Sequence, residues 1–392
     1  MHYHLTAEQQ EMAEKARKIA VEKILPIRKK YDKEGGFPWE VVEALAEAGL
    51  FKVFIPEENG GIVREGNGIT NMCLVTEELS RICGGIALAY AGTGLGAFPI
   101  ILFGNAEQKQ KFLSPIARGE KLAAFALTEA DAGSDAGAIK TTARKDGDFY
   151  YLNGTKIFIT NGGEADIYTV LALTAPEKGA RGASMFIVEK GTEGFEFGRK
   201  EDKMGIRGSV TKELIFNDVK VPAENLLGRE GLGFIVAMRT FDTSRPGVAA
   251  QALGIAQGAI DELLKITYSH EHEGKHLLAH QGIQWKIADM YAELYAARAL
   301  VYQVASLIDR GKAKEVSHLS AMAKMFASDV AMKISSQALE IVGGEAYTSE
   351  MPLEKMMRDA KITQIYEGTN QIQRNIIGGY ILKEAGKLAT KN

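Results

Sequence analysis

The chain has 392 residues, of which 46% are hydrophobic, so it can bury a large core and form two or three domains. Its net charge of −3, with 25% charged residues, argues against a nucleic-acid-binding protein, which would carry a basic stripe. Cys73 and Cys83 are the only cysteines and form no C-x-x-C pair, which indicates a reducing compartment.

Targeting and membrane segments are not evident in the sequence. The first ten residues, MHYHLTAEQQ, contain no basic segment followed by an apolar one, so no signal peptide is expected. The most apolar stretch, residues 82–103, is interrupted by several glycines and a proline, which argues against a membrane-spanning helix. We therefore expect a soluble, cytoplasmic protein.

The first third of the chain carries helix signals. Thr6 and Gln9 form a capping box in front of apolar residues at helical spacing, and this predicts a first helix. Pro38 predicts the start of a second helix, and Gly49 predicts its end. We assign residues 1–122 to an N-terminal helical domain.

A β domain is expected over residues 123–230. Asn153-Gly154, within DFYYLNGTKIFIT, separates two strand-like runs and is a strong signal for a two-residue hairpin turn. The runs DIYTVLAL, ASMFIVEK and KELIFNDVKV follow, and they are rich in β-branched and aromatic residues.

The last part of the chain, residues 231–392, is predicted to be helical again. Long segments rich in Ala, Leu, Met and Glu cover residues 231–268, 281–310, 314–342 and 370–388. Four helices of this kind suit an antiparallel bundle. The order of helices, strands and helices, without βαβ alternation, predicts an α+β fold.

A short metal-binding motif follows the first of these helical segments. His272-Glu273-x-x-His276 has the H-E-x-x-H pattern, which on a continuous helix describes a zinc peptidase with the glutamate as base. Gly274 weakens a helix at this place by about 1 kcal/mol relative to alanine, and Glu293 is an available distant third ligand. The alternative is a polar turn with solvated histidines, which is the interpretation that we favour.

A second short motif lies in the N-terminal third. Gly92-x-Gly94-x-x-Ala97 is a tolerated form of the dinucleotide fingerprint, which requires a strand before it and a helix after it. Neither flank shows strand-helix alternation. Close packing of a glycine-rich helix or loop is therefore the better interpretation.

Two longer stretches carry more specific chemistry. Residues 126–138, ALTEADAGSDAGA, offer hydroxyls, glycines and backbone amides that can hold a flavin edge and a pyrophosphate, although a polar turn explains them equally well. In residues 364–374, QIYEGTNQIQR, Glu367 follows an apolar-aromatic run. A carboxylate beside apolar surface has a raised pKa and can serve as a base; the alternative is a helix-capping acid.

These stretches together resemble the acyl-CoA dehydrogenase family, in particular its butyryl and medium-chain branch, over almost the whole chain. ALTEADAGSDAGA matches the family's first signature, and QIYEGTNQIQR matches the segment that carries its catalytic glutamate. EIVGGEAYTSEMPLEKMMRD resembles the second signature, with Ala346 in place of a glycine, and TSRPGVAAQALGIAQGA resembles the start of the C-terminal bundle. The family's fold has the same order of helical, β and helical domains.

The resemblance implies an oxidoreductase of fatty acid metabolism with FAD as cofactor and no metal. It would oxidise an acyl-CoA thioester to the trans-2-enoyl-CoA, or catalyse the reverse reduction. Glu367 would take the α proton, and its backbone N–H would hold the thioester oxygen. Electrons would be exchanged with electron-transferring flavoprotein, and the protein would be a homotetramer or homodimer. A zinc metallopeptidase remains the alternative.

The resemblance also implies the other site residues, some of which would contact the FAD of a neighbouring subunit. The expected FAD-binding residues are Phe125, Leu127, Thr128, Gly133, Ser134, Phe158, Ile159, Thr160, His270, Gln281, Glu340, Gly343, Gly344, Thr369 and Gln371. The expected substrate-binding residues are Ser134, Asp242, Arg245, Tyr366 and Gly368.

Three places depart from the family pattern or bear on substrate shape. His270 stands where the family usually has arginine, and Glu273 stands where phenylalanine is common, which puts the usual contact with a neighbouring subunit's FAD in doubt. Residues 90–99 would line the far end of the acyl pocket. Their glycines could leave room for a wide acyl group, or could only let helices pack closely.

Overall fold

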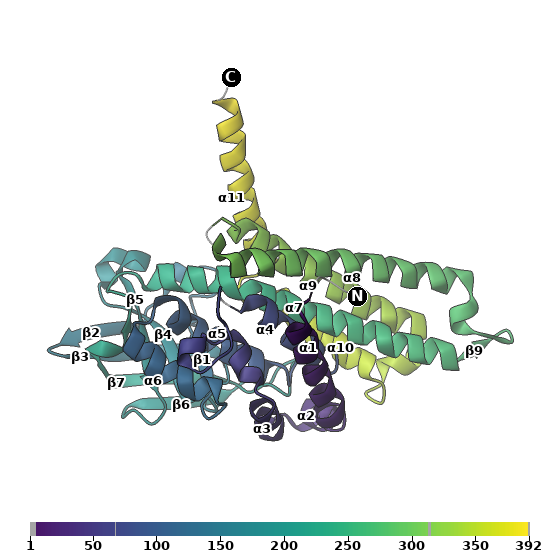
Figure 1. Cartoon of the computed structure of the whole chain (residues 1–392), viewed down its shortest axis with the longest axis horizontal. Helices are drawn as coiled ribbons and strands as arrows, with labels where there is room; N and C mark the ends of the chain where they lie inside the picture. The colour runs from purple at the N-terminus through teal and green to yellow at the C-terminus, as the bar shows by residue number, and fades with distance from the viewer. Residues whose placement is uncertain (1–4, 67, 313–314, 391–392) are drawn as a thin grey trace.

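The structure is a computed structural model that describes residues 5–66, 68–312 and 315–390. Helices come first in the chain, an eight-stranded sheet follows, and a second set of helices completes it (Figure 1). This is the α+β order expected from the sequence. Residues 1–4, which belong to the segment searched for a signal peptide, lie outside the described residues.

The N-terminal helices contact both the sheet and the C-terminal helices. Their bounds are α1 Ala7–Ile19, α2 Arg28–Glu34, α3 Trp39–Glu47, α4 Ile69–Ser80, α5 Leu88–Phe103 and α6 Ala106–Ala117. The predicted capping box is present, since the Thr6 hydroxyl accepts from Gln9 N and the Gln9 side chain accepts from Thr6 N. Pro38 is the N-cap of α3, and Gly49 follows that helix with a φ of 70°.

The sheet runs in the order β6-β7-β3-β2-β4-β5-β8, and β1 pairs with β4 in parallel. The strand bounds are β1 Ala123–Ala126, β2 Thr142–Asp146, β3 Phe149–Thr160, β4 Ile167–Leu173, β5 Ala183–Glu189, β6 Phe195–Lys200, β7 Thr211–Pro222 and β8 Leu226–Leu227. All seven residues of β4 are buried, and α5 and the long helix α7, Gly233–Ser269, both contact this strand. Helix α5 also contacts β1, which leads into the pocket described below.

The predicted hairpin turn at Asn153-Gly154 is wrong. Strand β3 passes straight through these residues, with a bulge against β7 between Leu152 and Gly154. Gly154 has a φ of 147°, and a Cβ there would lie 2.5 Å from the Thr141 hydroxyl, so the glycine serves a close approach within the sheet. The actual two-residue turn lies between β2 and β3 and begins at Gly147.

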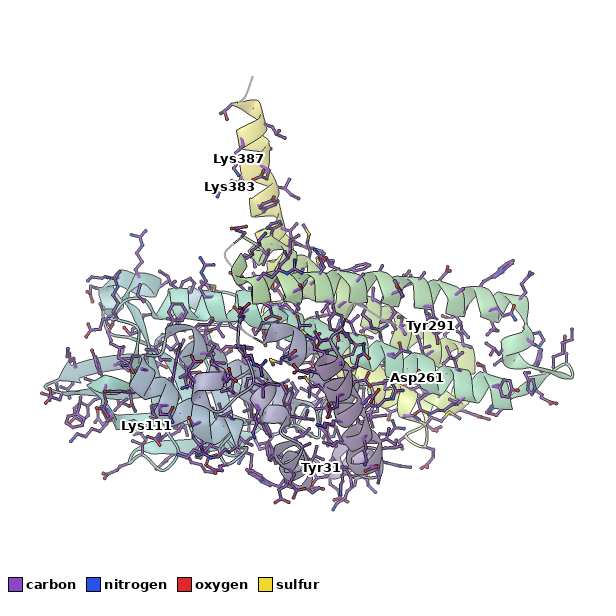
Figure 2. All side chains as sticks on the ribbon, viewed as in Figure 1. Tyr31, Lys111, Asp261, Tyr291, Lys383 and Lys387 are labelled. Carbon is purple, nitrogen blue, oxygen red and sulfur yellow. The ribbon has the colours of Figure 1, made fainter. Side chains whose placement is uncertain are left out.

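The C-terminal helices are α7 Gly233–Ser269, α8 Gln281–Leu307, α9 Ser317–Val342, α10 Pro352–Thr363 and α11 Asn370–Ala389. Helices α7, α8, α9 and α10 pack into the bundle, and α11 packs against α9 before its outer part projects away (Figure 1). The predicted helix over 370–388 is therefore confirmed as α11, and the bundle also contains α10, which the sequence analysis did not predict. Lys383 and Lys387 lie on the exposed outer part of α11 (Figure 2).

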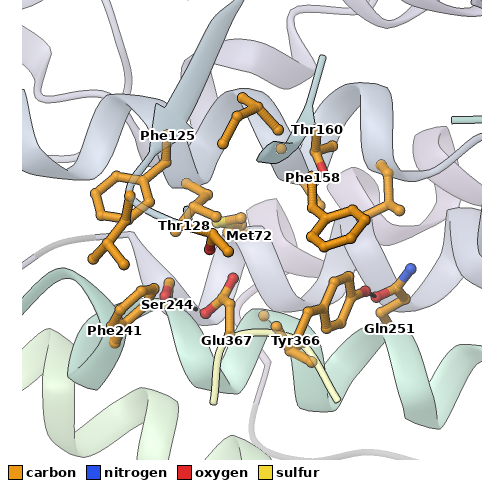
Figure 3. Close-up of a pocket in the computed structure, with 18 residues that line it drawn as sticks. Met72, Phe125, Thr128, Phe158, Thr160, Phe241, Ser244, Gln251, Tyr366 and Glu367 are labelled. Carbon is orange, nitrogen blue, oxygen red and sulfur yellow. Dashed lines mark hydrogen bonds between the residues drawn. The ribbon is translucent and has the colours of Figure 1, made fainter. Parts of the chain in front are cut away.

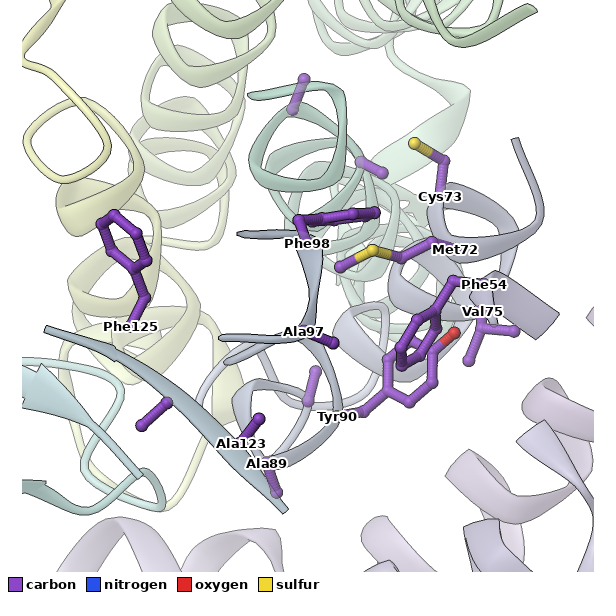
Figure 4. Packing of buried hydrophobic residues seen from close by; sticks show 14 of the residues in the cluster. Phe54, Met72, Cys73, Val75, Ala89, Tyr90, Ala97, Phe98, Ala123 and Phe125 are labelled. Atoms are coloured by element: carbon purple, nitrogen blue, oxygen red, sulfur yellow. The ribbon is translucent and has the colours of Figure 1, made fainter. Parts of the chain in front are cut away.

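The core between α4, α5 and β1 is tightly packed. Met72, Tyr90 and Phe98 are buried there, close to β1 at Ala123 (Figure 4). Core packing of this density leaves little freedom for the backbone of α5, which forms one wall of the pocket described below. Across the described residues, we find no helix with the length and apolar character needed to cross a bilayer.

A buried ion pair ties the segment after β1 to strand β3. Lys156 Nζ donates to Glu129 Oε1 at 2.7 Å and to the Leu127 carbonyl at 2.9 Å, and the Lys156 side chain is fully buried. The Glu129 carboxylate also accepts from the backbone N–H groups of Lys140 and Thr141. One ion pair thus fixes both ends of the loop over residues 127–141.

Lys156→Met should lower the free energy of unfolding by about 3–5 kcal/mol, because it leaves the Glu129 carboxylate buried without its cation. Lys140→Met is the matched control, since Lys140 pairs with Asp131 at 2.7 Å on an exposed part of the same loop. The control should leave stability nearly unchanged, because an exposed ion pair is screened by solvent. Chemical denaturation of both variants measures the difference, and equal stability of the two would contradict this role of Lys156.

Candidate active site

A pocket lies where α5, the strands β1 and β3, and α7 meet the turn between α10 and α11. Its walls are largely apolar, with Met72, Leu95 and Phe125 among the lining residues. In Figure 3, Glu367 lies in the middle of one wall, between Ser244 and Tyr366. The pocket therefore combines apolar surface with one carboxylate.

Helix α7 supplies one side of the pocket through residues at helical spacing. Phe241, Ser244, Val248 and Gln251 lie on the same face of the helix, and all of them line the pocket. The helix continues past the pocket into the bundle, so the same element carries side chains to both parts of the molecule (Figure 1).

Glu367 lies on a turn with an unusual backbone. It has a φ of 50° and is followed by Gly368 with a φ of 91°, so two successive residues adopt positive φ. This conformation is uncommon for a residue with a side chain, and surrounding contacts must stabilise it. The turn directs the Glu367 carboxylate into the pocket, where Oε2 accepts a hydrogen bond of 2.5 Å from the Ser244 hydroxyl (Figure 3).

Burial raises the pKa of Glu367 above the ordinary value of a glutamate. The Ser244 hydroxyl, Arg245 and Lys324 act in the opposite direction, because each favours the ionised carboxylate. Arg245 is 4% exposed, and its Nη1 donates to Asp242 Oδ1 at 2.9 Å. The pKa of Glu367 is therefore raised by burial, and the nearby cations limit how far it is raised.

Tyr366 and Gln251 close one end of the pocket. The Tyr366 hydroxyl donates to Gln251 Oε1, and Gln251 Nε2 donates to the Gly84 carbonyl at 2.9 Å. Gln251 is 1% exposed, so its amide is a buried polar group whose hydrogen bonds are satisfied. This end of the pocket is blocked by a fixed hydrogen-bonded group.

An exposed aromatic ring lies at the rim of the pocket. Phe158 is 58% exposed and has a φ of 58°, at a bulge of β3 between Lys156 and Ile159. A large apolar side chain held open by a strained backbone suits a planar aromatic ligand that would cover it. Thr128 and Thr160 lie beside it with hydroxyls for the ligand's polar edge, so these residues fit an isoalloxazine ring.

The structure brings together only some of the predicted site residues. Those that line the pocket are Phe125, Leu127, Thr128, Phe158, Ile159, Thr160, Tyr366 and Glu367. Gly133 and Ser134 lie on the exposed loop after β1. Gly368 is in the turn, Gln371 is exposed, and the Thr369 hydroxyl caps α11 by accepting from Ile372 N at 3.2 Å.

A second group of predicted residues lies at the other end of the bundle. It consists of His270, Gln281, Glu340, Gly343 and Gly344, at or near the ends of α7, α8 and α9. His270 is 19 residues beyond Gln251, which is about 28 Å along a helix. A contact between this group and a ligand in the pocket would therefore need a second copy of the chain.

His270 is paired with a carboxylate in this structure. Its Nε2 lies 3.0 Å from Glu345 Oε2, and this hydrogen bond raises the pKa of His270. The imidazolium form is thereby favoured, although histidine replaces the family's arginine.

The H-E-x-x-H residues form a β-hairpin and not a helix. Strands β9 Glu271–His272 and β10 Lys275–His276 pair in antiparallel, with Glu273 and Gly274 at positive φ in the turn. The two histidines are exposed and have no helical face in common. Among the described residues, no group of three or more His, Cys, Asp or Glu side chains is arranged to hold a metal ion.

The glycines of α5 serve packing. A Cβ on Gly94 would lie 2.6 Å from Met72 Cε, and one on Gly96 would lie 2.4 Å from the backbone nitrogen of Ala124. The favoured interpretation of Gly92-x-Gly94-x-x-Ala97 as close packing is confirmed, since these residues are inside a helix with no strand leading into it. Of the two interpretations of residues 90–99, close packing is the one that the structure supports.

Ser244, Gln251 and Lys324 are pocket or turn residues that the sequence analysis did not single out. Ser244 could have been found from its helical spacing, because it lies three residues after Phe241 and seven before Gln251. Lys324 carries no such signal, since it comes from a different helix and reaches the turn only through tertiary packing.

Comparison with known proteins identifies the family. The acyl-CoA dehydrogenase N-terminal, middle and C-terminal domain profiles match residues 6–120, 124–219 and 231–382. An acyl-CoA dehydrogenase of Bacillus subtilis is 46% identical over 97% of this chain and 99% of its own length. A short-chain-specific acyl-CoA dehydrogenase of Megasphaera elsdenii is 46% identical over 98% and 100%, and an NADH-dependent acryloyl-CoA reductase of Anaerotignum propionicum is 46% identical over 98% and 96%.

Comparison with solved structures indicates the same family. Butyryl-CoA dehydrogenase from Megasphaera elsdenii has a TM-score of 0.94, 46% identity and coverage of 97% of this chain and 100% of its own. A chain from a structural study of the electron-transferring flavoprotein of Acidaminococcus fermentans gives the same four values. An acyl-CoA dehydrogenase from Bacillus anthracis in complex with FAD has a TM-score of 0.89 at 35% identity, covering 98% and 68%. The chain therefore belongs to the acyl-CoA dehydrogenase family.

Proposed function

We propose that the protein is an FAD-dependent oxidoreductase that interconverts an acyl-CoA thioester and its trans-2-enoyl-CoA. The observation that carries this proposal is the Glu367 carboxylate, which is buried in an apolar pocket and has a raised pKa. A base with this property can remove a weakly acidic proton next to a carbonyl.

Glu367 would take the proton from the α carbon of the thioester, and its carboxylate would become the neutral acid. In the reverse direction the neutral acid would return the proton. Among the hydrogen bonds of the described residues, none uses the backbone N–H of Glu367. This donor is therefore available for the thioester oxygen, on which negative charge grows as the proton leaves.

FAD, when bound, accepts the hydrogen of the β carbon as a hydride. Phe158, Ile159 and Thr160 from β3, together with Leu127 and Thr128, would hold its ring system. Phe125 would support them from β1. Contacts between FAD and four further residues stay predictions: Gly133, Ser134, Thr369 and Gln371. A second copy of the chain would supply the remaining predicted FAD contacts, which come from His270, Gln281, Glu340, Gly343 and Gly344.

The proposed substrate is a short acyl chain. Gln251 lies about 10 Å along α7 from Ser244, and its buried, hydrogen-bonded amide would limit the length of the pocket beyond the reacting carbons. A long alkyl chain would have to separate Gln251 from its partners, which is unfavourable for buried polar groups. The short-chain-specific enzyme among the relatives supports this size.

The remaining predicted contacts to substrate are Ser134, Asp242, Arg245, Tyr366 and Gly368. Tyr366 lines the pocket, whereas Arg245 is buried against Asp242. We propose that Arg245 acts mainly on the charge of Glu367 and that Asp242 holds it there.

The proposed electron partner is an electron-transferring flavoprotein, in line with the study from which a similar chain comes. Because an acryloyl-CoA reductase is among the relatives, the proposal includes the reverse reaction, in which the enoyl-CoA is reduced. We further propose domain limits at residues 122/123 and 230/231, a homotetramer or homodimer as the assembly, and a cytoplasmic location.

Glu367→Gln should abolish reduction of the bound flavin by substrate while FAD and acyl-CoA still bind. The substitution keeps the shape and removes the basic group, so the rate should fall by at least about 100- to 10,000-fold. Rapid mixing with butyryl-CoA, following flavin bleaching, measures the rate, and equilibrium titration measures binding. A variant that bleaches at a near-native rate would show that the base is a different residue.

The rate of flavin reduction should decrease as pH falls through the raised pKa of Glu367, because only the ionised carboxylate is a base. Ser244→Ala removes a hydrogen bond that favours ionisation, so the acidic limb of the pH-rate profile should move to higher pH. Ser335→Ala is the control, since the Ser335 hydroxyl donates to carbonyls within α9. An unmoved limb in Ser244→Ala would argue that the hydrogen bond has no influence on the base.

Butyryl-CoA should be turned over with a higher kcat/KM than octanoyl-CoA. Gln251→Ala removes the amide that blocks the pocket, and it should increase the ratio of octanoyl- to butyryl-CoA turnover by about tenfold or more, the gain from one to two accommodated methylenes. Steady-state kinetics with both substrates on both proteins test this. A wild-type preference for octanoyl-CoA would refute the short pocket.

A further inference from the structure

The turn that carries Glu367 is held by a cation from another helix. Lys324 lies on α9, its side chain is fully buried, and its Nζ donates to the Gly368 carbonyl at 2.8 Å and to Asn370 Oδ1 at 3.0 Å. Gln373 Nε2 donates to the same Gly368 carbonyl at 2.8 Å. The carbonyl that follows the strained Glu367 residue is thus fixed by two donors.

Neighbouring residues of α9 extend this contact. Ser328 and Asp329 accept from Asn370 Nδ2 at 2.9 and 2.7 Å, and Asp329 Oδ1 also accepts from Gln364 Nε2 at 2.6 Å. One face of α9 therefore binds the turn at its start, at its centre and at the beginning of α11. If these contacts only had to hold the backbone of the turn, uncharged hydrogen-bond donors in place of Lys324 would be sufficient.

The positive charge of Lys324 is what distinguishes it from such a donor. Burial lowers the pKa of Lys324 to about 7, and the nearby Glu367 carboxylate acts against this decrease. The influence is mutual, because Lys324 lowers the pKa of Glu367. A buried ammonium is costly unless a compensating negative charge is near, and Glu367 and Asp329 provide that charge.

We propose that Lys324 is a positioning residue for the acid-base reaction: its ammonium fixes the turn that presents Glu367 and keeps the Glu367 carboxylate ionised. This inference rests on the proposed role of Glu367 as the base. Lys324 does not line the pocket, so it acts through Glu367 without contacting substrate.

Other charged groups lie on the helices packed around the turn. Helix α7 contributes Arg245 with its partner Asp242, and α9 contributes Asp329, which binds Arg374 of α11 at 3.1 Å. The contribution of α10 is Lys361, whose Nζ donates to Gln364 at the start of the turn. The residues of α4, α5, β1 and β3 that line the pocket carry no charge.

Lys324→Met should test the charge, with Lys333→Met as the matched control. Lys333 lies on the outer face of the same helix and pairs with Glu293. In the FAD-loaded enzyme with butyryl-CoA, the acidic limb of the pH-rate profile of Lys324→Met should move up by about one pH unit, which is a tenfold loss of rate on that limb. The rate should recover in part at high pH, where the carboxylate ionises without help. The control should keep the wild-type profile.

Lys324→Gln guards against a folding defect, because the amide keeps a hydrogen-bond donor and removes only the charge. Its acidic limb should also move up. Infrared titration of the substrate-free protein gives a second readout, since the band of the protonated Glu367 carboxyl, assigned by its loss in Glu367→Gln, should persist to higher pH. A wild-type limb and band in Lys324→Gln would overturn the inference even if Lys324→Met is inactive.

The two proposals can fail separately. If Glu367→Gln reduces the flavin at a near-native rate, then the proposed base is wrong, and this inference is wrong with it. If Glu367→Gln is inactive while both Lys324 variants keep the wild-type pH dependence, then the base stands and only the role of Lys324 is refuted.

Discussion

A carboxylate buried in an apolar wall is the constraint on which the rest of the site depends. Burial without compensation would keep Glu367 protonated, and full compensation would make it a weak base. The surroundings of Glu367 lie between these limits, because one hydroxyl, from Ser244, and two cations, Arg245 and Lys324, favour the ionised carboxylate against the effect of burial. Two helices, α7 and α9, must therefore pack correctly before the carboxylate has useful chemistry.

Two residues that line the pocket have a strained backbone. Phe158 and Glu367 both have positive φ, although neither is a glycine. Each such residue costs about 1–3 kcal/mol and persists only when its surroundings hold it. For Phe158 the bulge of β3 provides that support, and for Glu367 the hydrogen bonds of Gly368 with Lys324 and Gln373 provide it.

Helix α7 determines how the pocket relates to the rest of the molecule. It carries Ser244 and Gln251 into the pocket and ends at Ser269, just before the β9-β10 hairpin at the far end of the bundle (Figure 1). The predicted FAD contacts consequently fall into two groups that one chain keeps apart. This separation is the physical reason for expecting that a complete cofactor site includes more than one copy of the chain.

The sequence by itself determined the order of the elements and the helix at Thr6, because capping and periodicity are local signals, and it made Glu367 a candidate base through an apolar flank and the family resemblance. Local signals also misled at Asn153-Gly154, where neighbouring strands impose a bulge. Tertiary structure alone decided that α10 joins the bundle and that Lys324 reaches the Gly368 carbonyl. These outcomes depend on contacts between residues far apart in the chain, whose energies no short window of sequence contains.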